Sequence, residues 1–96
     1  MPQFICFLEP TRAEMPDNPT EQESNAVKAH FEYYQRLHKR GALILAGRTQ
    51  EAPHIGIMIF RSPTKDDAIS IAAQDPAIIQ GVFRCRVQAY QVALSE

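Results

Sequence analysis

The residues best suited to chemistry in this sequence are His30 and Asp75. An imidazole changes its protonation state near neutral pH, and a neighbouring carboxylate can fix its tautomer and stabilise the imidazolium form. Such a pair can act as a general acid or base that moves a proton on a substrate. The two residues are far apart in the sequence, so the pair exists only if the fold brings them together.

Each member of this pair also has a plain structural explanation. A histidine on an apolar helix face is more often a core residue than a catalyst. An aspartate directly before a proline, such as Asp75 before Pro76, often ends a helix in an Asx turn. The residues alone leave both interpretations open.

Three further side chains are candidates for substrate binding. Arg12 and Arg48 fall in predicted loops and could hold an anionic group, although solvated surface charges are the simpler explanation. Tyr33 lies within one helical turn of His30, where it either contributes to the site or packs the helix.

The sequence carries no pattern that is typical of a metal or nucleotide site. Its two cysteines, Cys6 and Cys85, form no CxxC pair, and the three histidines have no metal-ligand spacing with them. Only four glycines occur, and none builds a phosphate-binding loop. We expect no cofactor and no metal, and buried reduced thiols at both cysteines.

Composition indicates one small globular domain over residues 1–96. The chain is 45% hydrophobic and 22% charged, with a formal net charge of -1. That charge gives no basic surface for a phosphate backbone, so we expect no nucleic-acid partner. No signal-like start or membrane-length apolar run is present, which predicts a cytoplasmic protein without a membrane partner.

Local patterns predict two helices among four strands. Thr20 and Glu23 match a capping box at the start of a long helix, which Gly41 would end. Ser62 followed by Pro63 predicts the start of a second helix that reaches about Asp75, with one more turn at 77–80 closed by a glycine. The strands are predicted at 3–8, 42–46, 55–60 and 82–94.

This β-α-β-β-α-β order predicts an α+β fold of the ferredoxin-like type. Both helices should lie on one face of a four-stranded antiparallel sheet, because both crossovers are right-handed. The other face of the sheet would be left bare. A second copy of the chain is the simplest cover for it, so we expect a homodimer.

The same topology predicts where His30 and Asp75 meet. The inward stripe of the first helix is predicted as Val27, His30, Phe31, Tyr34, Leu37 and His38. On the second helix, Asp75 shares one side with Ala68 and Ala72. Because the helices run antiparallel, the end of the second lies beside His30. The longer loops, with Arg12, Arg48 and Thr49, gather at the same end of the sheet.

Two segments of the chain resemble the YciI-like family, which contains the YCII-related domain. They are HFEYYQRLHKRGALILAG at 30–47 and DPAIIQGVF at 75–83. The P-x-R of residues 10–12 and the capping T-x-x-E of residues 20–23 look like one branch of that family. Its members are related in fold to muconolactone isomerases and other dimeric α+β barrels.

The resemblance implies a dimer with a cleft near a His–Asp pair, and the matching positions are His30 and Asp75. Family members have been linked to dehydrochlorination of chlorinated aromatics. Many relatives have a proline where this chain has Arg48. We therefore expect a small cofactor-free enzyme that eliminates or isomerises a small cyclic or aromatic ligand. The alternative is a non-catalytic dimeric module that binds a metabolite or supports assembly.

Overall fold

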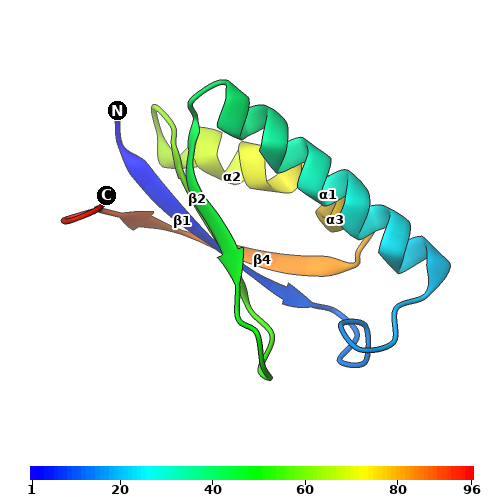
Figure 1. The fold of residues 1–96 in the computed structure, drawn as a ribbon. Helices are drawn as coiled ribbons and strands as arrows, with labels where there is room; N and C mark the ends of the chain where they lie inside the picture. Colours follow the sequence, from blue (N-terminus) through cyan, green and yellow to red (C-terminus); the bar gives the residue numbers. More distant parts are fainter.

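The computed structural model describes all 96 residues, and helices cover one face of its antiparallel sheet (Figure 1). The element bounds are β1 (Gln3–Pro10), α1 (Glu21–Lys39), β2 (Leu43–Arg48), β3 (Gly56–Arg61), α2 (Lys65–Ala73), α3 (Pro76–Ile79) and β4 (Phe83–Tyr90). The four strands lie in the order β2-β3-β1-β4, which is the ferredoxin-like arrangement. The predicted fold class is confirmed, with α3 as a short additional helix.

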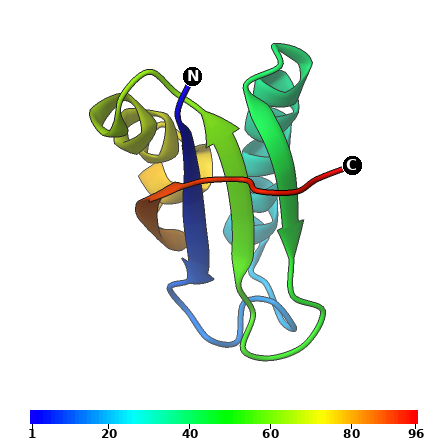
Figure 2. The same cartoon turned by 90° about the vertical axis from the view of Figure 1, so that its left-hand side faces the viewer.

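Alternating residues of the central strand β1 point to opposite faces of the sheet. Phe4, Cys6 and Leu8 face the helices and form a core cluster with Tyr34 and Leu37 of α1. The residues between them face the other side, where no helix packs (Figure 2). We call this side the open face, and its apolar residues are Ile5, Phe7, Leu45, Ile57 and Ile59.

The predicted ends of the first helix are confirmed. The Thr20 hydroxyl accepts from the Glu23 N–H at 3.1 Å, and the Thr20 N–H donates to the Glu23 carboxylate at 2.8 Å. The C-cap is Arg40, and Gly41 follows with a φ of 76°, which glycine adopts without strain. None of the helices is both long and apolar enough to cross a membrane.

The predicted inward stripe of α1 was too wide. Phe31 is 63% exposed and His38 is also exposed. Successive helical residues are rotated by about 100°. Phe31 therefore lies more than a quarter turn beyond His30, on the margin of the face that packs on the sheet. The buried stripe is narrower and centres on Ala26, Tyr34 and Leu37.

The second helix begins two residues later than predicted. Thr64 is its N-cap and accepts from the Asp67 N–H at 3.1 Å. Ser62 is buried at the end of β3, where its N–H donates to Pro2 O and its hydroxyl to Thr64 O. The bond to Pro2 O holds Ser62 beside the start of β1, and its hydroxyl is engaged with Thr64 O, which leaves the cap to Thr64.

The last strand is shorter than predicted because β4 pairs with β1 only from Phe83 to Tyr90. The chain then leaves the sheet and passes on the side of the open face (Figure 2). The expectation of a buried thiol is wrong for Cys85, which is exposed on this edge strand. Cys6, on the central strand, is fully buried as expected.

Candidate active site

Asp75 lies in the junction between α2 and α3 and is fully buried. The second helix ends at Ala73, so Asp75 does not belong to it as predicted. Instead, Asp75 is the N-cap of α3, and its Oδ1 accepts from the Ala77 N–H at 2.9 Å. Pro76 occupies the first position of α3, where its missing N–H removes no helical hydrogen bond.

His30 reaches this carboxylate from the middle of α1. Its Nδ1 lies 2.5 Å from Oδ2 of Asp75, and its side chain is 17% exposed. The ring is held by edge contacts with Tyr34 and Phe83, whose centroids lie 5.1 and 5.3 Å away. The fold thus brings together the two residues that the sequence singled out.

The packing of α1 on α3 positions the two side chains. A second apolar cluster joins these helices to the loop after β1 and to the start of β4, and its members are Met15, Ala26, Ala77 and Val82. Ala26 lies one helical turn before His30, and Ala77 lies two residues after Asp75. The apolar contact between the helices therefore fixes the separation of the imidazole and the carboxylate.

The arrangement defines the chemistry that is open to the imidazole. A carboxylate can only accept hydrogen bonds, so its contact with Nδ1 places a hydrogen on that atom. The lone pair of Nε2 is then free to accept a proton. The imidazolium that results would remain beside the negative charge of Asp75. This geometry suits a general acid and base.

Tyr34, which the sequence places on the inward stripe, is a polar neighbour of the pair. Tyr34 is buried, with an exposed fraction of 3%, and its hydroxyl has no hydrogen-bond partner. Burial raises the pKa of the phenol, and the nearby Cys6 and Asp75 add to the shift. Helical spacing predicts that Tyr34 faces inward, but no sequence signal shows that its hydroxyl is left unpaired.

Burial likewise keeps the thiol of Cys6 protonated, because it raises the pKa to about 12. The pKa of the Cys85 thiol is raised as well, because its sulfur is partly desolvated although the residue as a whole is exposed. A thiol is a poor nucleophile while it is protonated. The two cysteines are therefore inert neighbours of the imidazole and carboxylate at neutral pH. No group of three His, Cys, Asp or Glu side chains is placed to hold a metal ion.

The structure does not join Arg12 to the pair. Its guanidinium donates to both carboxylate oxygens of Glu23, at 2.6 and 3.0 Å, and to Asn18 O at 2.7 Å. The hydrogen bonds from Arg12, followed by the N–H of Thr20, lower the pKa of the Glu23 carboxyl to about 2. Arg12 thus fastens the loop after β1 to the start of α1.

Arg48 and Tyr33 also make no hydrogen bond to His30 or Asp75. Arg48 is exposed at the end of β2, opposite Gly56, and forms no ion pair. Tyr33 donates its hydroxyl hydrogen to Ile71 O at 2.6 Å, which ties α1 to α2. Their roles in substrate binding stay predictions.

Comparison with known proteins places this fold in a family. A solved structure with a similar fold is 5-chloro-2-hydroxyhydroquinone dehydrochlorinase from Burkholderia phenoliruptrix, in complex with 2,5-dihydroxybenzoquinone. It is 16% identical to this chain, with a TM-score of 0.72 over 93% of each chain. No curated protein matches. The family model of the YCII-related domain matches residues 3–89, and the chain therefore belongs to the YCII-related domain family.

Proposed function

We propose that this protein is a cofactor-free acid/base enzyme in which His30 moves the proton and Asp75 orients it. The observation that carries the proposal is the 2.5 Å contact between His30 Nδ1 and Asp75 Oδ2. Nε2 accepts a proton from the substrate, and the buried carboxylate stabilises the imidazolium that forms. The same atom then returns the proton to another position on the substrate.

The proposed substrate is a small hydroxylated ring with a leaving group such as chloride. This class is suggested by the name of the similar structure, a dehydrochlorinase in complex with a dihydroxybenzoquinone. Loss of HCl from a chlorinated hydroquinone removes two phenolic protons as C=O bonds form. One proton goes to the carbon that carries chlorine, and the C–Cl electrons leave on chloride. A group that both accepts and donates a proton fits this sequence of transfers.

Of the three predicted substrate-binding residues, Arg48 is the freest to meet an anionic group. It is exposed and forms no ion pair, whereas Arg12 is engaged with Glu23 and Tyr33 with Ile71 O. We infer that Arg48 contributes charge at the rim of the site. Arg12 would act through the loop that it fastens.

We also propose that the protein is a homodimer joined through the open face. Leu45 is 51% exposed on this face, and Phe7 and Ile57 are half-buried beside the paired Ile5 and Ile59, which are already buried within one chain. Apolar side chains grouped on a sheet face without helices favour an interface. A second copy can cover the patch with the same patch of its own, in an isologous contact.

The enzyme proposal is tested by chloride release from 5-chloro-2-hydroxyhydroquinone. We expect turnover by the native chain, and a loss of about 10²–10⁴-fold in kcat/KM in both His30→Ala and Asp75→Asn. His38→Ala removes an exposed imidazole from the same helix and should leave the rate unchanged. Exhaustive dialysis against EDTA should also leave the rate unchanged if the chemistry needs no metal.

The outcomes separate this proposal from a binding module. Full turnover in His30→Ala would exclude the imidazole as the proton carrier. A native chain that binds 2,5-dihydroxybenzoquinone without releasing chloride from the chlorinated compound would favour a non-catalytic ligand-binding protein. Circular dichroism of each variant shows whether a lost rate reflects chemistry or a lost fold.

A further inference from the structure

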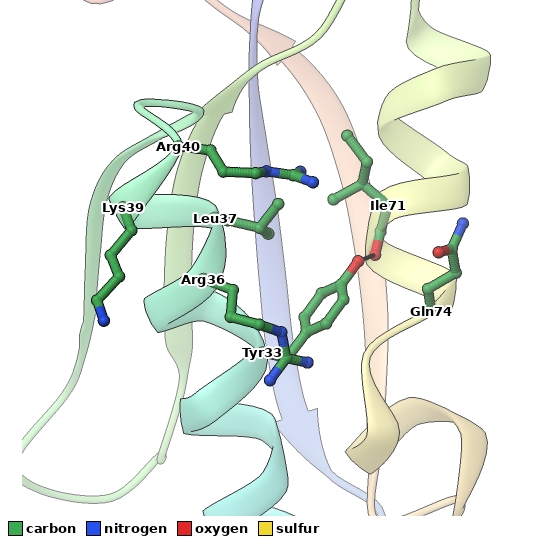
Figure 3. A pocket seen from close by; sticks show the side chains of 7 residues that line it. All are labelled: Tyr33, Arg36, Leu37, Lys39, Arg40, Ile71 and Gln74. Carbon is green, nitrogen blue, oxygen red and sulfur yellow. Dashed lines mark hydrogen bonds between the residues drawn. The ribbon is translucent and has the colours of Figure 1, made fainter.

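A groove between the last turns of α1 and the end of α2 lies apart from the contact of His30 with Asp75 (Figure 3). Its volume is about 410 Å³, which is within the usual range for small-ligand sites. Three cations line it, two from the last turn of α1 and one from its C-cap, and no acidic residue does. The remaining lining side chains are apolar or neutral, including Tyr33, Ile71 and Gln74.

The arginines are placed for one shared anion. Arg36 and Arg40 are one helical turn apart, so their charges project from the same side of α1. Figure 3 shows Arg40 reaching across the groove toward Ile71 and Arg36 lying against Tyr33, while Lys39 points away. Neither guanidinium forms an ion pair. Like charges at this spacing repel, and a bound anion between them would relieve that repulsion.

The walls of the groove suit the aromatic ring of a ligand. The ring of Tyr33 is fixed in place by its hydrogen bond to Ile71 O at 2.6 Å, and the guanidinium of Arg36 lies 5.9 Å from its centroid. Leu37 and Ile71 add apolar surface beside it. Burial raises the pKa of Tyr33 and the negative charge of Asp75 adds to the shift, while the positive charges of Arg40 and Arg36 act in the opposite direction.

We propose that this groove binds a small aryl phosphate, with the phosphate between Arg36 and Arg40 and the ring against Tyr33. Guanidinium groups present fork-like donors that match phosphate oxygens. The proposal does not depend on the function of His30, because no groove residue is a hydrogen-bond partner or ring-contact partner of the imidazole. His30→Ala should therefore bind the aryl phosphate as the native chain does.

The test is a titration of the ¹⁵N-labelled native chain with phenyl phosphate, followed by amide chemical shifts. We expect saturable shifts in residues 33–40 and 71–74. Phenyl phosphate should bind more tightly than inorganic phosphate or phenol, and added NaCl should weaken its binding. Arg36→Gln and Arg40→Gln should each weaken it by about five- to tenfold. Lys28→Gln, an exposed residue of the same helix, is the matched control for charge and should bind normally.

Several results would overturn the proposal. One is the absence of saturable shifts in these two segments. Equal losses in Arg40→Gln and Lys28→Gln would show that only net charge matters. If phenol bound as tightly as phenyl phosphate, the arginines would have no role in binding. If inorganic phosphate bound as tightly as phenyl phosphate, Tyr33 would have none. If a glutamine variant loses its fold, Arg36→Lys replaces it. This variant keeps the charge and tests whether binding needs the paired donors of the guanidinium group.

Discussion

Tyr34 places a phenol hydroxyl in the core with no hydrogen-bond partner, and its ring makes an edge contact with the ring of His30. A buried hydroxyl that makes no hydrogen bond carries the full penalty of its lost hydration. The ring, by contrast, belongs to the main apolar cluster and packs between α1 and the sheet. The stabilising part of this residue is therefore its ring, and its hydroxyl opposes folding.

Two substitutions at Tyr34 separate these contributions. Tyr34→Phe removes the unpaired hydroxyl and should leave the free energy of unfolding unchanged or raise it by about 1 kcal/mol. Tyr34→Ala removes the ring and should lower it by about 3–5 kcal/mol. Urea unfolding at constant m measures both. A clear loss of stability in Tyr34→Phe would mean that the hydroxyl is bonded in solution.

At this scale the sequence predicted the central pair but not its surroundings. His30 was found because helical spacing and antiparallel helices place it near Asp75. The bond from Arg12 to Glu23 was missed because it depends on how the loop after β1 folds back, which no periodic pattern encodes. The exposure of Cys85 was missed because its local sequence looks the same in a central strand as in an edge strand, and β4 lies at the edge of the sheet.

Among the elements, the start of α1 is stabilised by more than its cap. Glu23 accepts from the backbone of Thr20 and from the side chain of Arg12, so one carboxylate joins the helix to the preceding loop. The same loop contributes Met15 to the apolar cluster beneath α3. The position of α3, and with it Asp75, therefore depends on this attachment.

This attachment predicts sensitivity to acid. The pKa of Glu23 falls from its ordinary value of 4.5 to about 2 in the folded chain, so the unfolded chain binds the proton more readily. The stabilisation is complete above about pH 4.5 and is lost as the pH falls toward 2. The melting temperature of the native chain should fall as the pH is lowered over this range. Glu23→Gln should have a lower melting temperature at neutral pH, and that temperature should change less as the pH is lowered. Glu21→Gln, exposed in the same helical turn, should follow the native curve.

The second helix offers a test of its observed starting point. Thr64→Ala removes the cap of α2 and should lower the free energy of unfolding by about 1 kcal/mol, while Thr64→Ser should keep it. Urea midpoints of the two variants measure the difference. Equal stability of the alanine and serine variants would mean that Thr64 does not cap the helix. The sequence misplaced this cap because Ser62 and Thr64 are equally good residues for it, and only the end of β3 decides between them.

For the whole molecule, the order of strands was predictable because short connections and right-handed crossovers leave few arrangements. The state of assembly is different, because one chain shows only the surface that a partner would cover. Leu45 is 51% exposed, and it pairs across β2 and β3 with Ile59. Exposure of this kind on a sheet face is the physical reason to expect a second copy.

Leu45→Lys should therefore convert the proposed dimer to a monomer. A charge at this position would have to be buried without a partner when the two open faces meet. Sedimentation equilibrium of the native chain and the variant measures the change in mass. Ile79→Lys is the matched control, because Ile79 is 71% exposed on α3, on the helix side of the sheet (Figure 1), and its substitution should leave the dimer intact. A native chain that sediments as a monomer, or a Leu45→Lys variant that still dimerises, would rule out the open face as the interface.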